Sequence, residues 1–308
     1  MLLQPDTIAS FRASGCRILE QAPMKDFTTF HIGGPADYFI TAPDEQAAGR
    51  VMAACRQQKI PVLLVGKGSN LLVSDEGIDG VVLRLDGDSR PTDCDVGSGR
   101  VTAYGGTSLA KVCRTARDYG LTGMEFAFGI PGTVGGSVYM NAGAYGGQVA
   151  DILYSATLLS PDGVLRTMKT EDLQLGYRHS LLMETGEIAV GAVFQLSPGN
   201  PEHIGARMEE LMNKRREKQP LEYPSAGSFF KRPEGHFAAA LIDQCRLKGF
   251  SVGDAQVSEK HAGFVVNRGE ATCQDMIRLK REVCRRVYEQ TGVELKPEVE
   301  LTGRNVRW

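Results

Sequence analysis

One stretch of the chain is so rich in glycine that it restricts the fold more than any other part of the sequence. Residues 129–137 read Gly-Ile-Pro-Gly-Thr-Val-Gly-Gly-Ser, with four glycines and one proline in nine positions. Residues 141–147, Asn-Ala-Gly-Ala-Tyr-Gly-Gly, follow almost at once. Because glycine has no Cβ, such a backbone can approach another group closely. The stretch is either a rigid loop with several exposed N–H groups that binds a large flat ligand and its pyrophosphate, or a glycine-rich loop packed under a sheet.

A second glycine-containing segment, residues 66–70, follows directly after an apolar run. It reads Gly-Lys-Gly-Ser-Asn. Inward-turned backbone N–H groups form a nest that binds phosphate oxygens. The Rossmann fingerprint would need a third glycine at position 71, where Leu71 stands, and a P-loop would need a longer loop closed by Gly-Lys-Ser/Thr. The segment is therefore either another kind of phosphate nest or only a tight exit from a strand.

Composition is typical of a globular protein and excludes several classes. The 308 residues are 42% hydrophobic and 23% charged, enough for two or three domains. The net charge of -2 argues against a nucleic-acid partner. The seven cysteines include no Cys-x-x-Cys pair, so we expect reduced thiols in a cytoplasmic protein and no metal site. We expect no membrane partner, since we find no signal-peptide pattern and no apolar stretch of ~20 residues.

Apolar periodicity and turn residues predict a first part rich in strands. Asp44 is a plausible N-cap for a helix over 44–59, and Gly120 ends a second helix over 108–119. Pro161-Asp162-Gly163 predicts a turn between two strands. The expected strands cover 60–65, taken as buried, and 81–85, 152–159, 164–168 and 188–196.

The character of the sequence changes near residue 198, where Pro-Gly-Asn-Pro is interpreted as a linker. A charged helix is predicted from there to about Lys218, followed by a short apolar helix over 236–246. Thr272 and Asp275 form a capping-box pattern at the start of the last helix. A final strand is expected over 293–301. The basic run over 214–218 is interpreted either as a solvated helix face or as one side of a diphosphate groove.

Three side chains are candidates for chemistry. Residues 225–231, Ser-Ala-Gly-Ser-Phe-Phe-Lys, are interpreted as a small turn that presents the Ser228 hydroxyl near the Lys231 cation. Arg178 has a planar fork that suits a carboxylate or a developing enolate. Glu298 follows a proline near the C-terminus. Taken singly, each has a plainer interpretation, as a turn serine, a surface arginine or a solvent-facing glutamate.

Taken together and in this order, these segments resemble the UDP-N-acetylenolpyruvoylglucosamine reductase family. The resemblance runs from about Phe27 to Leu301. Its markers are Thr29-Phe30-His31-Ile32-Gly33-Gly34, the segments 66–70 and 129–147, Tyr177-Arg178-His179-Ser180, Ala226-Gly227-Ser228-Phe229-Phe230-Lys231 and Pro297-Glu298-Val299.

The resemblance implies an α+β fold with an FAD-binding module of the vanillyl-alcohol-oxidase (PCMH) type, followed by an α/β substrate-binding domain. It implies an N-terminal region over 1–30 that packs with the C-terminal strand, an FAD domain over 31–197 and a substrate domain over 198–308. FAD would be held non-covalently along the two glycine-rich segments. Its implied contacts are Gly66, Lys67, Gly68, Ser69, Asn70, Leu71, Gly129, Pro131, Gly132, Thr133, Gly135, Gly136, Ser137, Asn141, Ala142 and Gly143.

The implied reaction reduces UDP-N-acetylglucosamine enolpyruvate to UDP-N-acetylmuramate, a cytoplasmic step of bacterial peptidoglycan synthesis. NADPH would give a hydride to FAD, and the reduced flavin would pass it to the enolpyruvyl double bond. By the family's pattern Ser228 is the general acid, while Arg178 and Glu298 stabilise an enolate-like state. The implied substrate contacts are Tyr145, Tyr177, Lys218, Lys231, Arg232 and Lys248.

The chain departs from the family's pattern in a few places. Ser225 stands where many relatives have asparagine, and Arg232 where some do. The segment between Arg178 and Leu196 leaves no room for the tyrosine-bearing substrate loop of one subgroup, so we expect the subgroup that lacks it. Two alternatives stay open: an FAD-dependent alcohol or sugar oxidase of the same cofactor fold, and a flavin- or nucleotide-sugar-binding sensor without turnover.

Overall fold

The computed structural model describes residues 2–87 and 90–308. They form two compact units, each assembled from separate stretches of sequence. The first unit comprises Met1–Leu19, Tyr38–Gly66 and Gly80–Arg215, and the second comprises Glu20–Asp37, Lys67–Asp79 and Arg216–Trp308. The division into consecutive regions at residues 30 and 197 stays a prediction.

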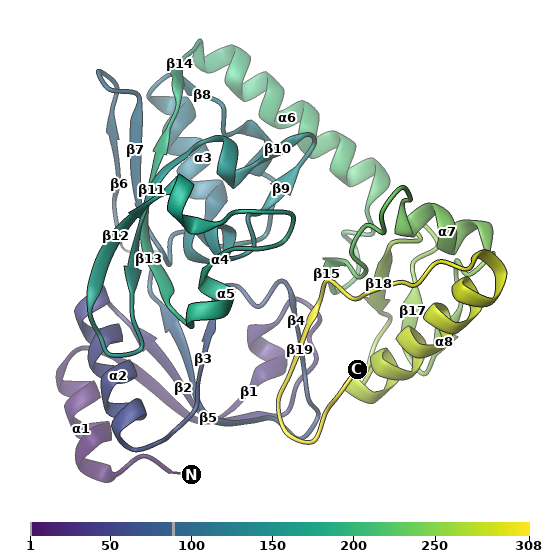
Figure 1. The fold of residues 1–308 in the computed structure, drawn as a ribbon, viewed down its shortest axis with the longest axis horizontal. Coiled ribbons are helices and arrows are strands. Elements are labelled where there is room, and N and C mark those ends of the chain that lie inside the picture. Colours follow the sequence, from purple (N-terminus) through teal and green to yellow (C-terminus); the bar gives the residue numbers. More distant parts are fainter. Residues whose placement is uncertain (1, 88–89) are drawn as a thin grey trace. The chain divides into compact units, whose positions relative to one another are not determined.

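An antiparallel sheet of five strands forms the larger core of the first unit, in the order β12–β11–β13–β7–β6 (Figure 1). α3 (Leu109–Asp118) and α4 (Val134–Tyr139) pack against it and bury their apolar residues there. The predicted turn at 161–163 is confirmed, with Gly163 at a φ of +83° that favours glycine. The strands are β6 (Thr92–Asp95), β7 (Arg100–Tyr104), β11 (Leu153–Leu159), β12 (Leu165–Lys169) and β13 (Ile188–Gln195).

A smaller sheet has the order β1–β2–β5–β3. The predicted N-cap of α2 (Glu45–Gln57) is confirmed, because the Asp44 carboxylate accepts a hydrogen bond of 2.7 Å from the Ala47 N–H. The expectation of a buried strand over 60–65 is wrong, since only Val65 of β3 is buried. β3 is the edge strand of its sheet, so one side of it has no neighbouring strand. The elements are α1 (Pro5–Ala13), β1 (Arg17–Pro23), β2 (Pro35–Ala42), β3 (Val62–Val65) and β5 (Ile78–Leu85).

Short elements complete the first unit. The predicted linker at 198 takes part in a strand pair, since β14 (Ser197–Pro198) pairs with β8 (Leu121–Thr122). β9 (Gly143–Ala144) and β10 (Gly147–Gln148) form a hairpin. The others are the 3-10 helices η2 (Glu125–Ala127), η3 (Val149–Asp151) and η4 (Thr170–Leu173), the helix α5 (Leu182–Thr185), and α6 (Pro201–Lys218), which the first unit contains up to Arg215.

The second unit has its own core, centred on the antiparallel sheet β15–β18–β17–β16 and the helix α8 (Cys273–Thr291). The capping box predicted for α8 is confirmed: the Thr272 hydroxyl accepts from the Asp275 N–H, and the Asp275 carboxylate accepts from the Thr272 N–H. Gly292 ends α8 at a φ of +72°. The other elements are η1 (Met24–Phe27), β4 (Leu71–Val73), β15 (Ser225–Ser228), α7 (Ala238–Gln244), β16 (Ser251–Val252), β17 (Ala255–Val257), β18 (Phe264–Asn267) and β19 (Glu300–Thr302).

Two sequence predictions for this unit are wrong in detail. The final strand is much shorter than the predicted 293–301, and β19 pairs in parallel with β4. Pro297 lacks an N–H, so the segment before β19 cannot form a continuous ladder. The segment interpreted as a turn around Ser228 is instead strand β15, paired with β18 and interrupted by a register shift. In the described part of the chain, no helix is long and apolar enough to cross a membrane.

An ion pair between the buried Glu187 carboxylate and the half-exposed Arg166 side chain, beside the large sheet, is expected to make the stability of the first unit depend on pH. The Glu187 carboxylate, whose side chain is 6% exposed, accepts hydrogen bonds of 2.7 and 2.5 Å from Arg166 of β12. These hydrogen bonds hold the pKa of Glu187 below its usual range. A carboxylate whose folded pKa is depressed stabilises the protein above its unfolded pKa, and this stabilisation is lost as the pH falls through the folded pKa.

We therefore expect Glu187→Gln to lower the free energy of unfolding at neutral pH. The difference from the parent protein should shrink as the pH falls below about 4. Urea titrations at a series of pH values measure both quantities. Glu171→Gln, at an exposed position, is the control and should change the free energy of unfolding little at any pH. If the change in the free energy of unfolding caused by Glu187→Gln does not vary with pH, the pKa of Glu187 is not depressed in the folded protein.

Candidate active site

Strand β15 presents Ser228 to solvent in front of a buried aromatic pair. Ser228 is exposed, whereas Phe229 and Phe230 are buried with ring centroids 5.1 Å apart. Gly227 adopts a φ of +74°, and the register against β18 shifts between Ser225 and Ser228. Such a bulge re-aims side chains at the edge of a sheet. Among the described residues the Ser228 hydroxyl has no hydrogen-bond partner, which leaves it available to a ligand.

The C-terminal segment runs antiparallel to the residues after Ser228 and brings Glu298 beside them. The Glu298 N–H donates to the Phe229 carbonyl at 2.9 Å, and the Lys231 N–H donates to the Lys296 carbonyl at 2.8 Å. Glu298 is 9% exposed. The Asn70 side chain donates to the Glu298 carbonyl at 3.1 Å. Two of the three candidate catalytic residues, Ser228 and Glu298, thus lie on paired segments of the second unit.

Arg178 belongs to the first unit and sits on a tight turn. The N–H groups of Gly176 and His179 each donate to the other's carbonyl, and Arg178 between them has a φ of +53°. The buried Ser180 hydroxyl donates to the Tyr139 carbonyl at 2.7 Å and fixes the end of this turn. A left-handed φ costs a non-glycine residue about 1–3 kcal/mol and is found preferentially at functional sites. The guanidinium lies 5.4 Å from the ring centroid of the exposed Tyr177.

The glycine-rich stretch is only partly a loop. Residues 134–139 form α4, whose N-cap Thr133 accepts a hydrogen bond of 3.3 Å from the Gly136 N–H. The Gly135 N–H donates to the Gly105 carbonyl, and the buried Ser137 hydroxyl donates to the Val134 carbonyl. The expectation that these N–H groups are exposed is therefore wrong for Gly135 and Gly136. A Cβ on Gly135 would lie 2.5 Å from the Ala189 carbonyl oxygen, so this glycine is required by packing against β13.

Asn141 holds the neighbouring loops together. Its buried side-chain amide donates to the Gly176 carbonyl at 2.9 Å, and its side-chain oxygen accepts from the Ala150 N–H at 2.9 Å. Beyond it, the β9–β10 hairpin carries the 43% exposed Tyr145. A Cβ on the next residue, Gly146, would meet no atom within 4 Å. Open space therefore lies at the tip of the hairpin, while Asn141 supports the turn that carries Arg178.

The two glycines of the segment 66–70 are also packed closely against other residues of the protein. A Cβ on Gly66 would lie 2.6 Å from the Thr133 hydroxyl oxygen. A Cβ on Gly68, at a φ of +62°, would lie 2.2 Å from the Phe27 carbonyl oxygen. These contacts support the interpretation as a tight strand exit, and phosphate binding there stays a prediction. Of the other predicted contacts, Lys67 is exposed, and Leu71 begins β4.

The basic side chains predicted to contact the substrate are exposed or half-buried. Lys218 ends α6, and Lys231 follows β15. The Arg232 guanidinium stacks 4.6 Å from the Phe237 ring centroid. Lys248 makes an exposed ion pair of 3.1 Å with Asp243. Because an exposed pair contributes little, Lys248 can exchange its partner for an anionic ligand at small cost.

Comparison with known proteins connects the two units to one enzyme family. Residues 36–169 match a family described as "FAD binding domain", and residues 219–302 match "UDP-N-acetylenolpyruvoylglucosamine reductase, C-terminal domain". The UDP-N-acetylenolpyruvoylglucosamine reductase of Lachnoclostridium phytofermentans is 47% identical over 94% of each chain. That of Agathobacter rectalis is 48% identical over 93% of this chain and 94% of its own. The chain belongs to the UDP-N-acetylenolpyruvoylglucosamine reductase family.

A solved structure of the same family supports the fold. The crystal structure of the reductase from Thermus caldophilus matches with a TM-score of 0.78 and 36% identity, over 93% of this chain and 98% of that one. With the FAD-binding match, this confirms the expected α+β class, with a PCMH-type FAD module followed by a substrate-binding domain. The cofactors expected for the family, FAD and NADPH, follow from this membership.

The first unit contains a cation that fits an anionic cofactor, Arg215, which the sequence singled out only as part of the basic run 214–218. Arg215 of α6 is half-buried, and its Cδ would lie 3.2 Å from a Cβ on Gly129. Within residues 2–87 and 90–308 its guanidinium makes no ion pair and no hydrogen bond. Burial lowers its pKa, although arginine remains charged in proteins. A half-buried cation without a carboxylate beside the glycine-rich stretch fits a group such as the FAD pyrophosphate or the flavin dione.

Helical spacing could have placed Arg215 on the buried face of α6, whereas the composition of the basic run could not. The buried residues of α6 are Ile204, Met208 and Leu211. Position 215 continues this series at the same spacing and therefore lies on the buried face. The two interpretations of the run 214–218, a solvated helix face and one side of a diphosphate groove, thus apply to different residues of the run. Lys214 is ion-paired with Glu210 on the exposed face, whereas Arg215 turns toward the glycine-rich stretch.

We expect Arg215→Met to weaken FAD binding roughly tenfold to a hundredfold, because hydrogen bonds to a charged group contribute about 1.5–3 kcal/mol. Methionine keeps the apolar part of the side chain and removes its charge. Equilibrium dialysis of the apoprotein against FAD measures the affinity. Lys214→Met is the matched control and should bind FAD like the parent protein. Unchanged FAD affinity in Arg215→Met would place this guanidinium away from the cofactor.

Proposed function

We propose that this chain reduces UDP-N-acetylglucosamine enolpyruvate to UDP-N-acetylmuramate with NADPH as the hydride donor. The observation that carries the proposal is the pairing of the Ser228 and Glu298 segments in a chain whose family membership covers nearly its whole length. Bound FAD supplies a carrier that accepts the hydride from NADPH and delivers it to the substrate. The residues of the chain bind the two substrates, stabilise charge and move one proton.

Ser228 is proposed as the proton donor to the carbon next to the one that receives the hydride. Its hydroxyl is exposed and has no hydrogen-bond partner among the described residues. The Phe229 and Phe230 rings behind it are buried, which holds the strand in place. A serine hydroxyl is a weak acid, so we propose that Lys231 or a water molecule assists it. The proton lost to carbon is replaced from solvent.

Arg178 and Glu298 are proposed to stabilise the charge that develops on the substrate carboxylate during hydride addition. Glu298 would have to be protonated, or share a proton, to donate a hydrogen bond to this charge. A guanidinium and such a donor aimed at the developing charge lower the barrier more than they stabilise the ground state. The left-handed backbone at Arg178 and the backbone pairing at Glu298 fix both residues before substrate binds. Tyr145, Tyr177, Lys218, Lys231, Arg232 and Lys248 are proposed to contact the substrate.

The proposal also includes the division of the chain into regions and the cellular compartment in which the protein acts. We propose an FAD region over 31–197, which contains the matched residues 36–169, a substrate region over 198–308, and residues 1–30 packed with the C-terminal strand. We propose a cytoplasmic site of action, because all seven cysteines are free thiols, as is usual in reducing compartments. We also place the chain in the subgroup without the tyrosine-bearing loop.

We expect Ser228→Ala to separate the two half-reactions. NADPH should still bleach the flavin absorbance at the parent rate, because hydride transfer to FAD does not use the serine. The return of colour with UDP-N-acetylglucosamine enolpyruvate should slow by roughly a hundredfold to ten-thousandfold. Anaerobic stopped-flow absorbance measures each step separately.

Ser225→Ala is the matched control for this experiment. Ser225 lies on the same strand, and its carbonyl accepts from the Thr29 hydroxyl, an interaction that the substitution keeps. Both half-reactions should therefore stay close to parental. If Ser228→Ala reoxidises with the enolpyruvyl substrate as fast as the parent, another group is the proton donor. If only oxygen restores the colour in the parent protein, the proposed substrate is wrong.

A further inference from the structure

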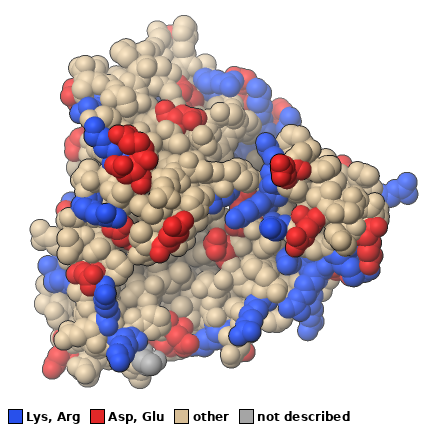
Figure 2. All heavy atoms as spheres, in the orientation of Figure 1, with Lys and Arg blue, Asp and Glu red and all other residues tan. Residues whose placement is uncertain are grey.

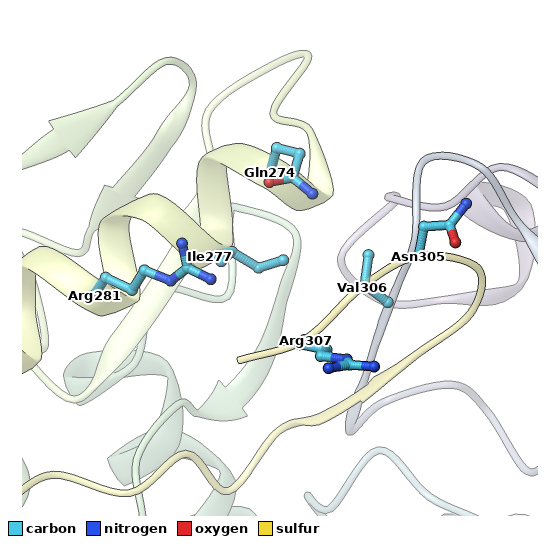
Figure 3. Close-up of a pocket in the computed structure, with 6 residues that line it drawn as sticks. All are labelled: Gln274, Ile277, Arg281, Asn305, Val306 and Arg307. Carbon is cyan, nitrogen blue, oxygen red and sulfur yellow. The ribbon is translucent and has the colours of Figure 1, made fainter.

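The second unit contains a pocket that the proposed reaction does not use. It has a volume of about 570 Å³ and lies between α8 and the C-terminal tail (Figure 3). This size is within the range of small-molecule sites. The residues that line it are Gln274, Ile277, Arg281, Asn305, Val306 and Arg307, none of which is a candidate for FAD, NADPH or enolpyruvyl-sugar binding.

The lining combines an apolar floor with polar and cationic groups. Gln274, Ile277 and Arg281 lie on one face of α8, since they are separated by three and four positions. Ile277 points from α8 toward Val306 on the tail (Figure 3). Arg281 lines the pocket from α8 and Arg307 lines it from the tail, where its side chain extends away from α8 in the view of Figure 3. A flat or apolar ligand body with an anionic group matches this combination.

The carboxylates of α8 do not neutralise these arginines. Asp275 is engaged in the capping box. Glu282 pairs with Arg285 and Arg286, which lowers its pKa to about 2, and Glu289 pairs with Arg285. In the described chain, Arg281 and Arg307 form no ion pair and no hydrogen bond.

Nearby acids outside α8 are engaged as well. The Asp75 carboxylate accepts hydrogen bonds from the backbone N–H groups of Cys273 and Gln274, and Glu76 accepts from the Asn305 side chain. Figure 2 shows Lys and Arg side chains over the region where Figure 1 places α8. Within the described residues, Asp75 and Glu76 accept from neutral N–H groups in these contacts and form no ion pair there with Arg281 or Arg307.

The tail that lines the pocket also contacts the residue that follows β15, the strand that carries Ser228. Trp308, the residue after Arg307, packs edge to face against Phe229 with ring centroids 5.7 Å apart. Lys280 of α8 lies 5.6 Å from the same tryptophan ring. A ligand that draws Arg307 toward Arg281 therefore alters the surroundings of Trp308, which in turn contacts the residue that follows Ser228.

We propose that this pocket binds a small phosphorylated metabolite, held by Arg281 and Arg307, and that its binding changes the packing of Trp308 on Phe229. Guanidinium groups bind phosphate through paired hydrogen bonds, and the side-chain amide of Gln274 supplies a further donor. An influence on turnover through Ser228 rests on the proposed function. Binding itself does not, and it can be measured without turnover.

Isothermal titration calorimetry of the FAD-loaded protein with ADP, inorganic pyrophosphate and adenosine tests the proposal. We expect saturable binding of the two phosphate compounds and none of adenosine. The fluorescence of Trp308, the only tryptophan of the chain, should change with the same midpoint. Arg281→Gln and Arg307→Gln should each weaken binding roughly tenfold, the loss of one charge-assisted contact.

Arg278→Gln is the matched control, since it removes an exposed arginine of α8 that does not line the pocket. It should bind both phosphate compounds like the parent protein. The proposed site is wrong if the parent shows no saturable heat, or if Arg281→Gln and Arg307→Gln bind as tightly as the parent. Equal binding of adenosine would refute the phosphate chemistry. Binding without a change in fluorescence would refute the connection to Trp308.

Discussion

The second unit depends on the packing around Phe229. This fully buried ring contacts Phe30, Phe230 and Trp308 at centroid distances of 6.2, 5.1 and 5.7 Å. Its backbone carbonyl also accepts the hydrogen bond from Glu298. One residue therefore joins the N-terminal part of the chain, the strand of Ser228 and the C-terminus. Because aromatic burial is strong but non-directional, the backbone hydrogen bond is needed to fix which residue lies beside which.

Arginines in this protein divide into two kinds by their surroundings. Arg304 binds the carboxylates of Asp37 and Asp79, which raise its pKa, and its role is to hold segments of the second unit together. Within the part of the chain that the structure describes, Arg215 has no carboxylate partner, and burial lowers its pKa. A cation that is removed from water without a partner is costly to the folded protein, and such a cost is offset when an anionic ligand binds. Arg281 and Arg307 of the C-terminal pocket also have no acidic partner among the described residues, but they are exposed, so this cost of desolvation applies to Arg215 alone of the three.

Glycine served two purposes that the sequence could not separate. Gly66, Gly68 and Gly135 are required because a Cβ would collide with the protein's own atoms. Gly146 instead has open space around it, and its φ of +87° at the tip of the β9–β10 hairpin is what favours glycine there. The same residue type therefore meets close packing in one place and a left-handed backbone in another. The two cases differ in which segment, distant in sequence, packs against the glycine, and a local sequence pattern does not contain that information.

The sequence by itself determined the helix caps, one hairpin turn and the family. Helix caps at Asp44 and Thr272 and the turn at 161–163 were predicted correctly, because a cap or turn depends on residues only a few positions apart. The order of the motifs was specific enough to predict the family and its cofactors. Ser228 and Glu298 could be named from these motifs, although the shape of their segments could not.

Only the tertiary structure decided that the Ser228 segment is a bulged strand, that the Glu298 N–H pairs with the Phe229 carbonyl, and that Arg215 has no acidic partner among the residues the structure describes. It also revealed the pocket beside α8. Each of these depends on contacts between residues that are far apart in the chain, where burial and partner charges are set by the whole fold. Local propensity cannot determine them, because the same side chain is exposed in one fold and desolvated in another.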